Sequence, residues 1–163
     1  MTLSKYAVVA LLGTALLAGP ALADPADTAK AAGKDASWLF IQTAESAKFD
    51  GTTLTLENVS PSVVMFTDRP ARMAEAVPTA KFLTNWDQGG AKSFQSNPPN
   101  AGLTSLVDGK LQTTTVELTK PQLEGTTLTY EARVVEGTVP PTAGPSSLFI
   151  DAGCNYSPTT PNC

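Results

Sequence analysis

The 163-residue sequence contains no histidine, only two cysteines, and few basic side chains. Without an imidazole, the chain can form no Ser-His or Cys-His nucleophile pair and no histidine-ligated zinc, copper or haem site. Lys and Arg number 11 against 15 Asp and Glu, and no basic run occurs. Because nucleic-acid binding relies on clustered Lys and Arg, we expect no nucleic-acid partner.

The chain has one long apolar run, and it lies at the N-terminus. Residues 6–17 follow Lys5, Pro20 ends the segment, and Ala21 and Ala23 place small residues before Asp24. This layout predicts a secretory signal peptide over residues 1–23, cleaved after Ala23. The run is about a dozen residues, whereas a bilayer span needs ~20. We therefore expect a protein of the periplasm or the medium, with no membrane span in the mature chain.

The mature chain would be one domain with a short segment at each end. Cleavage removes Lys5 and no acid, which leaves 10 basic and 15 acidic residues and a net charge of −5. Residues 24–36 have no large apolar side chain and predict a flexible leader, residues 37–152 the domain, and residues 153–163 a tail. In a secreted protein, Cys154 and Cys163 predict a disulfide that staples this tail. A redox or copper-thiolate role and pairing with another chain stay open.

From Trp38 onwards, apolar and polar residues alternate in short runs that end at Gly, Asp and Pro. Such alternation indicates antiparallel strands with one buried face. We predict an all-β domain, a single antiparallel two-sheet sandwich of about seven strands. The apolar spacing of Phe82, Leu83 and Trp86 predicts one short helix in the longest connection, between residues 77 and 90. The strands are expected at residues 38–44, 53–59, 62–67, 103–107, 111–118, 126–135 and 147–151.

The candidate ligand-binding residues are Asp68, Arg69, Arg72 and Trp86. Two arginines flank the rigid Pro70 just after a predicted strand, and paired guanidinium groups could clamp a carboxylate or sulfate while Asp68 holds one of them. Alternatively, Asp68 accepts hydrogen bonds from turn amides and an arginine covers a core edge. Trp86 could equally be core packing.

No metal site, cofactor or catalytic residue is predicted. The acids that could supply calcium oxygens lie at separate turns, whereas a calcium loop needs several close ligands. With histidine absent, a general acid or base would have to be a carboxylate, lysine or tyrosine. The acids considered as calcium ligands are Asp50, Asp108 and Asp151.

Five short motifs occur along the mature chain: Val59-Ser60-Pro61, Phe66-Thr67-Asp68-Arg69-Pro70-x-Arg72, Phe82 to Trp86, Pro98-Pro99-Asn100-Ala101 and Ser147-Leu148-Phe149-Ile150-Asp151. Together they resemble a family of small exported bacterial proteins of unassigned function. The family pattern has serine before the Asp-Arg-Pro element, where this chain has Thr67, and the cysteine-bearing tail lies outside the match. The resemblance implies one exported domain and no particular activity.

Together these features predict an exported, non-catalytic module that binds an envelope protein or a small anionic ligand. The alternatives are a carboxylate-dependent hydrolase of cell-envelope polymers, which paired acids could support, and a purely structural envelope component.

The signal peptide yields the first testable prediction. When a bacterial host exports the chain, the recovered protein should begin at Asp24, because signal peptidase cuts after small residues at −3 and −1. N-terminal sequencing and intact mass check this. A matched variant, Ala23→Arg, should accumulate unprocessed, and recovery of the uncut wild-type chain would contradict the prediction.

Overall fold

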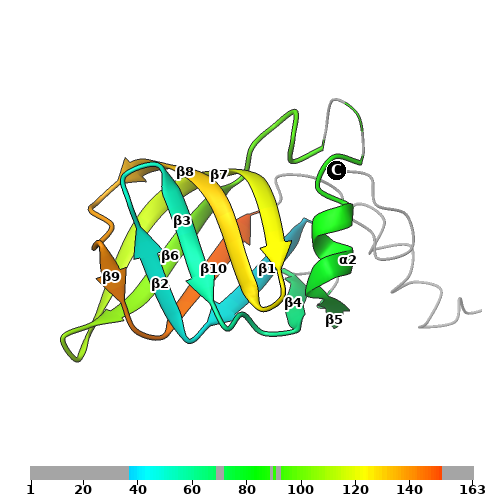
Figure 1. Ribbon diagram of the computed structural model, residues 1–163. Helices are drawn as coiled ribbons and strands as arrows, with labels where there is room; N and C mark the ends of the chain where they lie inside the picture. The colour runs from blue at the N-terminus through cyan, green and yellow to red at the C-terminus, as the bar shows by residue number, and fades with distance from the viewer. Residues whose placement is uncertain (1–36, 69–71, 89, 91–92, 152–163) are drawn as a thin grey trace, which may run out of the picture.

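A computed structural model describes residues 37–68, 72–88, 90 and 93–151. These residues form an all-β domain with one antiparallel ten-stranded sheet and one short helix (Figure 1). The predicted signal peptide, leader and cysteine tail lie outside the described residues. The elements are β1 (Trp38–Ala44), β2 (Ser46–Phe49), β3 (Thr53–Glu57), β4 (Ser62–Thr67), β5 (Ala74–Pro78), α2 (Thr79–Thr84), β6 (Asn100–Val107), β7 (Lys110–Glu124), β8 (Thr127–Glu136), β9 (Thr142–Ala143) and β10 (Ser146–Asp151).

Two pairs of short strands act as two long strands with a bend in each. β1 and β2 are separated by Glu45 alone, and β9 and β10 by Gly144 and Pro145. β1 pairs with β10 and β2 pairs with β9 in one unbroken register, from Leu39 opposite Asp151 to Lys48 opposite Thr142. The first and last described strands therefore form one continuous bent ladder.

This ladder closes the sheet into a ring. β10 pairs with β6, which pairs with β7, and β7 pairs with β8. β8 then pairs with β3, and β3 returns to β2. The ring is flattened, so that β3 and β8 lie in front of β6 and β10 (Figure 1). β4 pairs with β1 outside the ring, and β5 pairs with β4.

The all-β, antiparallel prediction is confirmed, while the strands number ten in one sheet where we expected seven in two. The three further strands are β2, β5 and β9, and each is short, with at most one buried side chain. Alternation cannot be recognised in a segment that buries a single residue. Val77 and Pro78 end β5 and so precede the helix.

β7 continues past residue 118, where the predicted strand ended, and it does so through a β-bulge. Its register with β8 shifts between Thr119 and Gln122, where Lys120 has a φ of 47° and Pro121 follows. A bulge leaves one residue out of the ladder, so a proline without an N–H is tolerated there. The strand can therefore continue through a residue that usually ends one.

Aromatic side chains fill the end of the ring that α2 covers. Phe82 of α2 packs against Phe40 and Trp86, with ring centroids 5.0 and 6.0 Å away. Trp86 also contacts Phe94 and Tyr130, at 4.8 and 5.6 Å. Clustered aromatic rings in tilted and edge-to-face geometry add to the stabilisation from their burial. One short helix is present in the predicted connection, but it ends at Thr84, so Trp86 follows it instead of lying within it.

A buried polar network fixes the start of α2. Gln42 of β1 is fully buried, and its Nε2 donates to the Ser60 carbonyl at 3.3 Å. The Thr79 hydroxyl lies 2.8 Å from the same carbonyl and 3.3 Å from Gln42 Oε1. Buried polar groups are costly unless they are paired, so these contacts specify where the helix begins.

Three buried groups among the described residues are exceptions to this pairing: the Tyr130 hydroxyl and the indole N–H groups of Trp38 and Trp86. The Tyr130 ring is fully buried, and its hydroxyl has no hydrogen-bond partner among the described residues. Burial raises the pKa of this phenol, so it stays neutral.

Tyr130→Phe should therefore raise the free energy of unfolding by about 1 kcal/mol, because an unpaired buried hydroxyl is removed while the ring stays. Urea unfolding measures the change. Tyr130→Leu, which also loses the ring, should destabilise, and a loss of stability in Tyr130→Phe would disprove the unpaired state.

Candidate functional site

The outer face of the part of the sheet formed by β5, β4, β1 and β10 carries a row of apolar side chains. Ala76 lies opposite Val64, Val64 opposite Ile41, and Ile41 opposite Phe149. Val64 and Phe149 are 45% and 48% exposed. The same face continues through three neighbouring residues, so the patch spans four strands. We call these seven residues the outer apolar face: Ala76, Val64, Ile41, Phe149, Ala74, Phe66 and Leu39.

β5 is the terminal strand of this part of the sheet. The Thr67 N–H donates to the Met73 carbonyl, and the Thr79 N–H donates to the Pro61 carbonyl. The odd-numbered residues of β5 therefore direct their backbone groups towards β4. Ala74 and Ala76 have the opposite parity, and their N–H and C=O groups point away from the sheet. Within the described part of the chain, no strand pairs with this side of β5.

The turn between β4 and β5 contains the predicted arginine cluster. Asp68 follows β4 directly and is exposed, and its carbonyl accepts a hydrogen bond of 3.2 Å from the Arg72 N–H. Arg72 is also exposed and has a φ of 49°. Arg69 lies outside the described residues. Asp68 and Arg72 are thus brought together at one end of β5, while their role in binding stays a prediction.

Trp86 lies far from solvent in the aromatic cluster. Only 5% of its surface is exposed, and its rings contact Phe82, Phe94 and Tyr130. It lies in the turn after α2 rather than on the outer apolar face. This agrees with the packing interpretation of Trp86, and its ligand-binding role stays a prediction.

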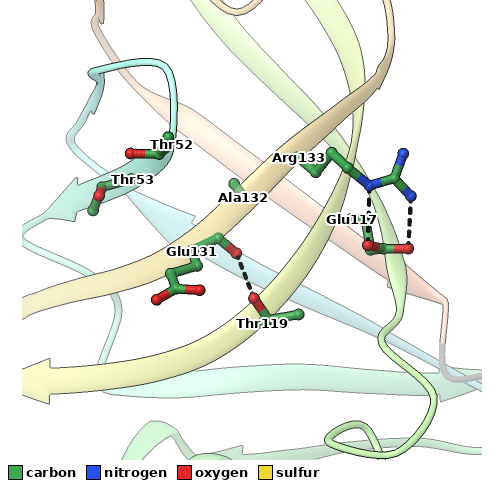
Figure 2. A pocket seen from close by; sticks show the side chains of 7 residues that line it. All are labelled: Thr52, Thr53, Glu117, Thr119, Glu131, Ala132 and Arg133. Atoms are coloured by element: carbon green, nitrogen blue, oxygen red, sulfur yellow. Dashed lines mark hydrogen bonds and ion pairs between the residues drawn. The ribbon is translucent and has the colours of Figure 1, made fainter.

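A second candidate is a shallow hollow of about 420 Å³ over β7, β8 and the start of β3 (Figure 2). Its charged groups pair with one another. Arg133 donates from Nε and Nη2 to the two carboxylate oxygens of Glu117, at 3.2 and 2.9 Å, and this pairing raises the arginine pKa. Lys120 Nζ lies 2.9 Å from Glu131. Figure 2 shows the Glu131 carboxylate pointing away from that of Glu117.

Two further acids, in the turn before β3 and at its end, serve local structure. Asp50 accepts hydrogen bonds from the Thr53 and Thr52 amides at 2.7 and 2.9 Å, and these bonds lower its pKa. Glu57 accepts from Lys48 and Ser46 at 2.6 and 2.7 Å, which also lowers its pKa. Carboxylates held ionised in this way act as acceptors that fix turns and strand pairs. None is positioned as a proton donor.

Neither a metal centre nor a membrane helix is found in the portion of the chain that the structure describes. No group of three or more acids, cysteines or histidines there could hold a metal ion. No helix in that portion is long and apolar enough to cross a bilayer.

Sequence reasoning missed the outer apolar face and the free edge of β5. Val64 and Phe149 were placed in strands, but the alternation of apolar and polar residues does not predict that β4 and β10 become the two neighbours of β1. Glu75 lay in no predicted element. The signal that could have found the face is the apolar character of residues 63–66, which leaves no polar side for solvent.

No family model, curated protein or solved structure matches this chain. The resemblance to exported bacterial proteins therefore stays a prediction. The site has to be argued from its own geometry.

The left-handed backbone of Arg72 gives a prediction for the β4–β5 turn. Arg72→Gly should raise the free energy of unfolding by about 0.5–1 kcal/mol, since glycine adopts positive φ without a Cβ clash. Thermal and urea unfolding measure this. Arg72→Ala is the matched control, because it removes the charge but keeps the Cβ. Equal stabilities of the two variants would contradict the strained geometry.

Proposed function

We propose that this protein is an exported, non-catalytic, sandwich-like module that binds another protein through the outer apolar face. The observation that carries the proposal is the unbroken cross-strand row from Ala76 through Val64 and Ile41 to Phe149. Contiguous exposed apolar surface is uncommon on monomeric proteins and marks interaction sites. The closed ring supports this face from behind.

The contrast with the opposite part of the sheet strengthens the argument. On β7 and β8, Glu117, Lys120, Glu131 and Arg133 pair across the strands, although Leu111 and Val135 are also exposed there, at 76% and 48%. The four strands of the outer apolar face carry two ionisable side chains, Glu75 and, opposite Leu39, Asp151. Charged side chains are therefore more numerous on β7 and β8 than on the strands of the outer apolar face.

Asp68 and Arg72 lie where a protein interface would have its polar rim. Interfaces combine an apolar centre with charged and polar residues around it. Both side chains are exposed at the turn beside the outer apolar face. In this proposal the arginine cluster predicted to clamp a small anion instead contributes to rim contacts with the partner.

The hydrolase alternative receives less support from the described carboxylates. Glu117 and Glu131 both line the hollow, but each is paired with a cation. A glycoside hydrolase needs one protonated acid and a second carboxylate aligned with it across the bond that breaks. The purely structural alternative differs from our proposal in requiring no specific partner.

Site-specific photocrosslinking in an exporting host tests the proposal. We would place benzoylphenylalanine at position 64 or 149, on the outer apolar face, and at position 111 as the matched control. Leu111 is apolar and 76% exposed, but it lies near the β6–β7 turn, away from this face. Crosslinking should give the same discrete product from positions 64 and 149 and none from 111.

Loss of that product in a Val64→Lys background should follow, because a charge would be buried in the contact. Circular dichroism would establish that this variant folds. Two results would reject the proposal: no product from either face position, or products of equal yield from position 111.

A further inference from the structure

We propose that the edge of β5 with which no described strand pairs accepts an extended segment of the partner protein as an eleventh strand, with a lysine or arginine of that segment opposite Glu75. This rests on the proposed function and names the partner's chemistry. Strand addition to a sheet edge is a common mode of peptide recognition, in which backbone hydrogen bonds give affinity and alternate side chains give specificity.

The backbone of β5 offers four groups for this pairing. Ala74 and Ala76 each direct one N–H and one C=O away from β4, as the parity of the Thr67–Met73 and Pro61–Thr79 bonds requires. On either side the edge is blocked. The Arg72 N–H is already bonded to Asp68, and Pro78 has no N–H. A partner strand is therefore centred on Glu75.

Glu75 determines which side chain fits at that centre. Because Glu75 makes its backbone pair with Met65 of β4, it would form a non-hydrogen-bonded pair with the added strand. In such pairs the side chains lie closest, with Cβ atoms about 4.5–5.5 Å apart. Glu75 is exposed, and no other ionisable side chain lies on β1, β4 or β5. A basic residue opposite it would gain a favourable cross-strand pair.

The same geometry argues against a second copy of this chain. Antiparallel pairing of two β5 edges through all four groups sets Glu75 against Glu75 of the other copy. Like charges directly opposite each other on a sheet are destabilising. Shifting the register to avoid this contact requires the Arg72 N–H or a proline N–H, which the edge does not supply. Glu75 thus favours a basic partner and opposes self-association.

The two residues of the added strand that flank the basic one would lie on the same side of the sheet as the outer apolar face. They lie opposite Ala74 and Ala76, whose rows continue to Phe66 and Val64. Apolar side chains at these two positions would extend each row by one residue. The expected recognition sequence is therefore apolar, basic, apolar, in extended conformation.

Binding of two peptides to the purified protein tests this inference. The probes are blocked Thr-Ser-Thr-Val-Lys-Val-Thr-Ser-Thr and its twin with Glu in place of Lys, followed by amide NMR shifts. The Lys peptide should perturb the Ala74 and Ala76 amides and bind at least about threefold more tightly than the Glu peptide. Glu75→Lys should reverse this preference. Glu124→Lys, at an exposed position of the β7–β8 turn, is the matched control and should leave it unchanged.

Ala76→Pro is the second variant, because proline is tolerated on an edge strand and removes one of the four groups. It should lose binding of both peptides and keep the fold. The inference is overturned if neither peptide perturbs β5, if the wild type shows no charge preference, or if the wild-type protein forms a dimer through β5. Crosslinking from position 64 remains positive if only strand addition fails, so that failure is distinguishable from failure of the proposed function.

Discussion

The whole architecture depends on one bent ladder, in which β1 and β2 pair with β10 and β9 without a change of register. The bend falls at Glu45 on one side and at Gly144 and Pro145 on the other. At Gly144 a Cβ atom would lie 3.3 Å from the Leu106 carbonyl, so the approach to β6 favours glycine. Closing the ring gives each of its strands except the two-residue β9 a neighbour on both sides, which protects them from edge-to-edge aggregation. It also leaves β4 and β5 outside.

That division gives the molecule two outer surfaces of different chemistry. The ring strands β7 and β8 pair their exposed charges, with Arg133 bound to Glu117 and Lys120 to Glu131. Val64 of β4 and Phe149 of β10 are exposed on the outer apolar face, and no strand of the described residues pairs with the outer edge of β5. A sheet edge and an apolar face are each prone to unspecific association. The proposed partner would cover both at once.

The sequence was sufficient for the strand class and insufficient for the site. Strands such as β1 and β4 were predicted with correct bounds because buried and exposed residues alternate along them. β5 was missed, since four of its five residues are exposed and it buries only Val77. Neighbour relations such as Ile41 beside Phe149 depend on ring closure over a hundred residues, which no local pattern encodes. Asp68 and Arg72 were recognised because a charged turn with a proline is a local feature.

The bent ladder also determines when the chain can complete its fold. It joins residues 39–48 to residues 142–151, the two ends of the described domain. Such distant pairings carry a large loop-closure entropy and make folding slow. A nascent chain that has not yet supplied β10 can form the β6–β7 and β7–β8 hairpins but not the ring. The ring can therefore close only after the chain has been synthesised through residue 151, so the order of synthesis sets the order in which the strands can pair.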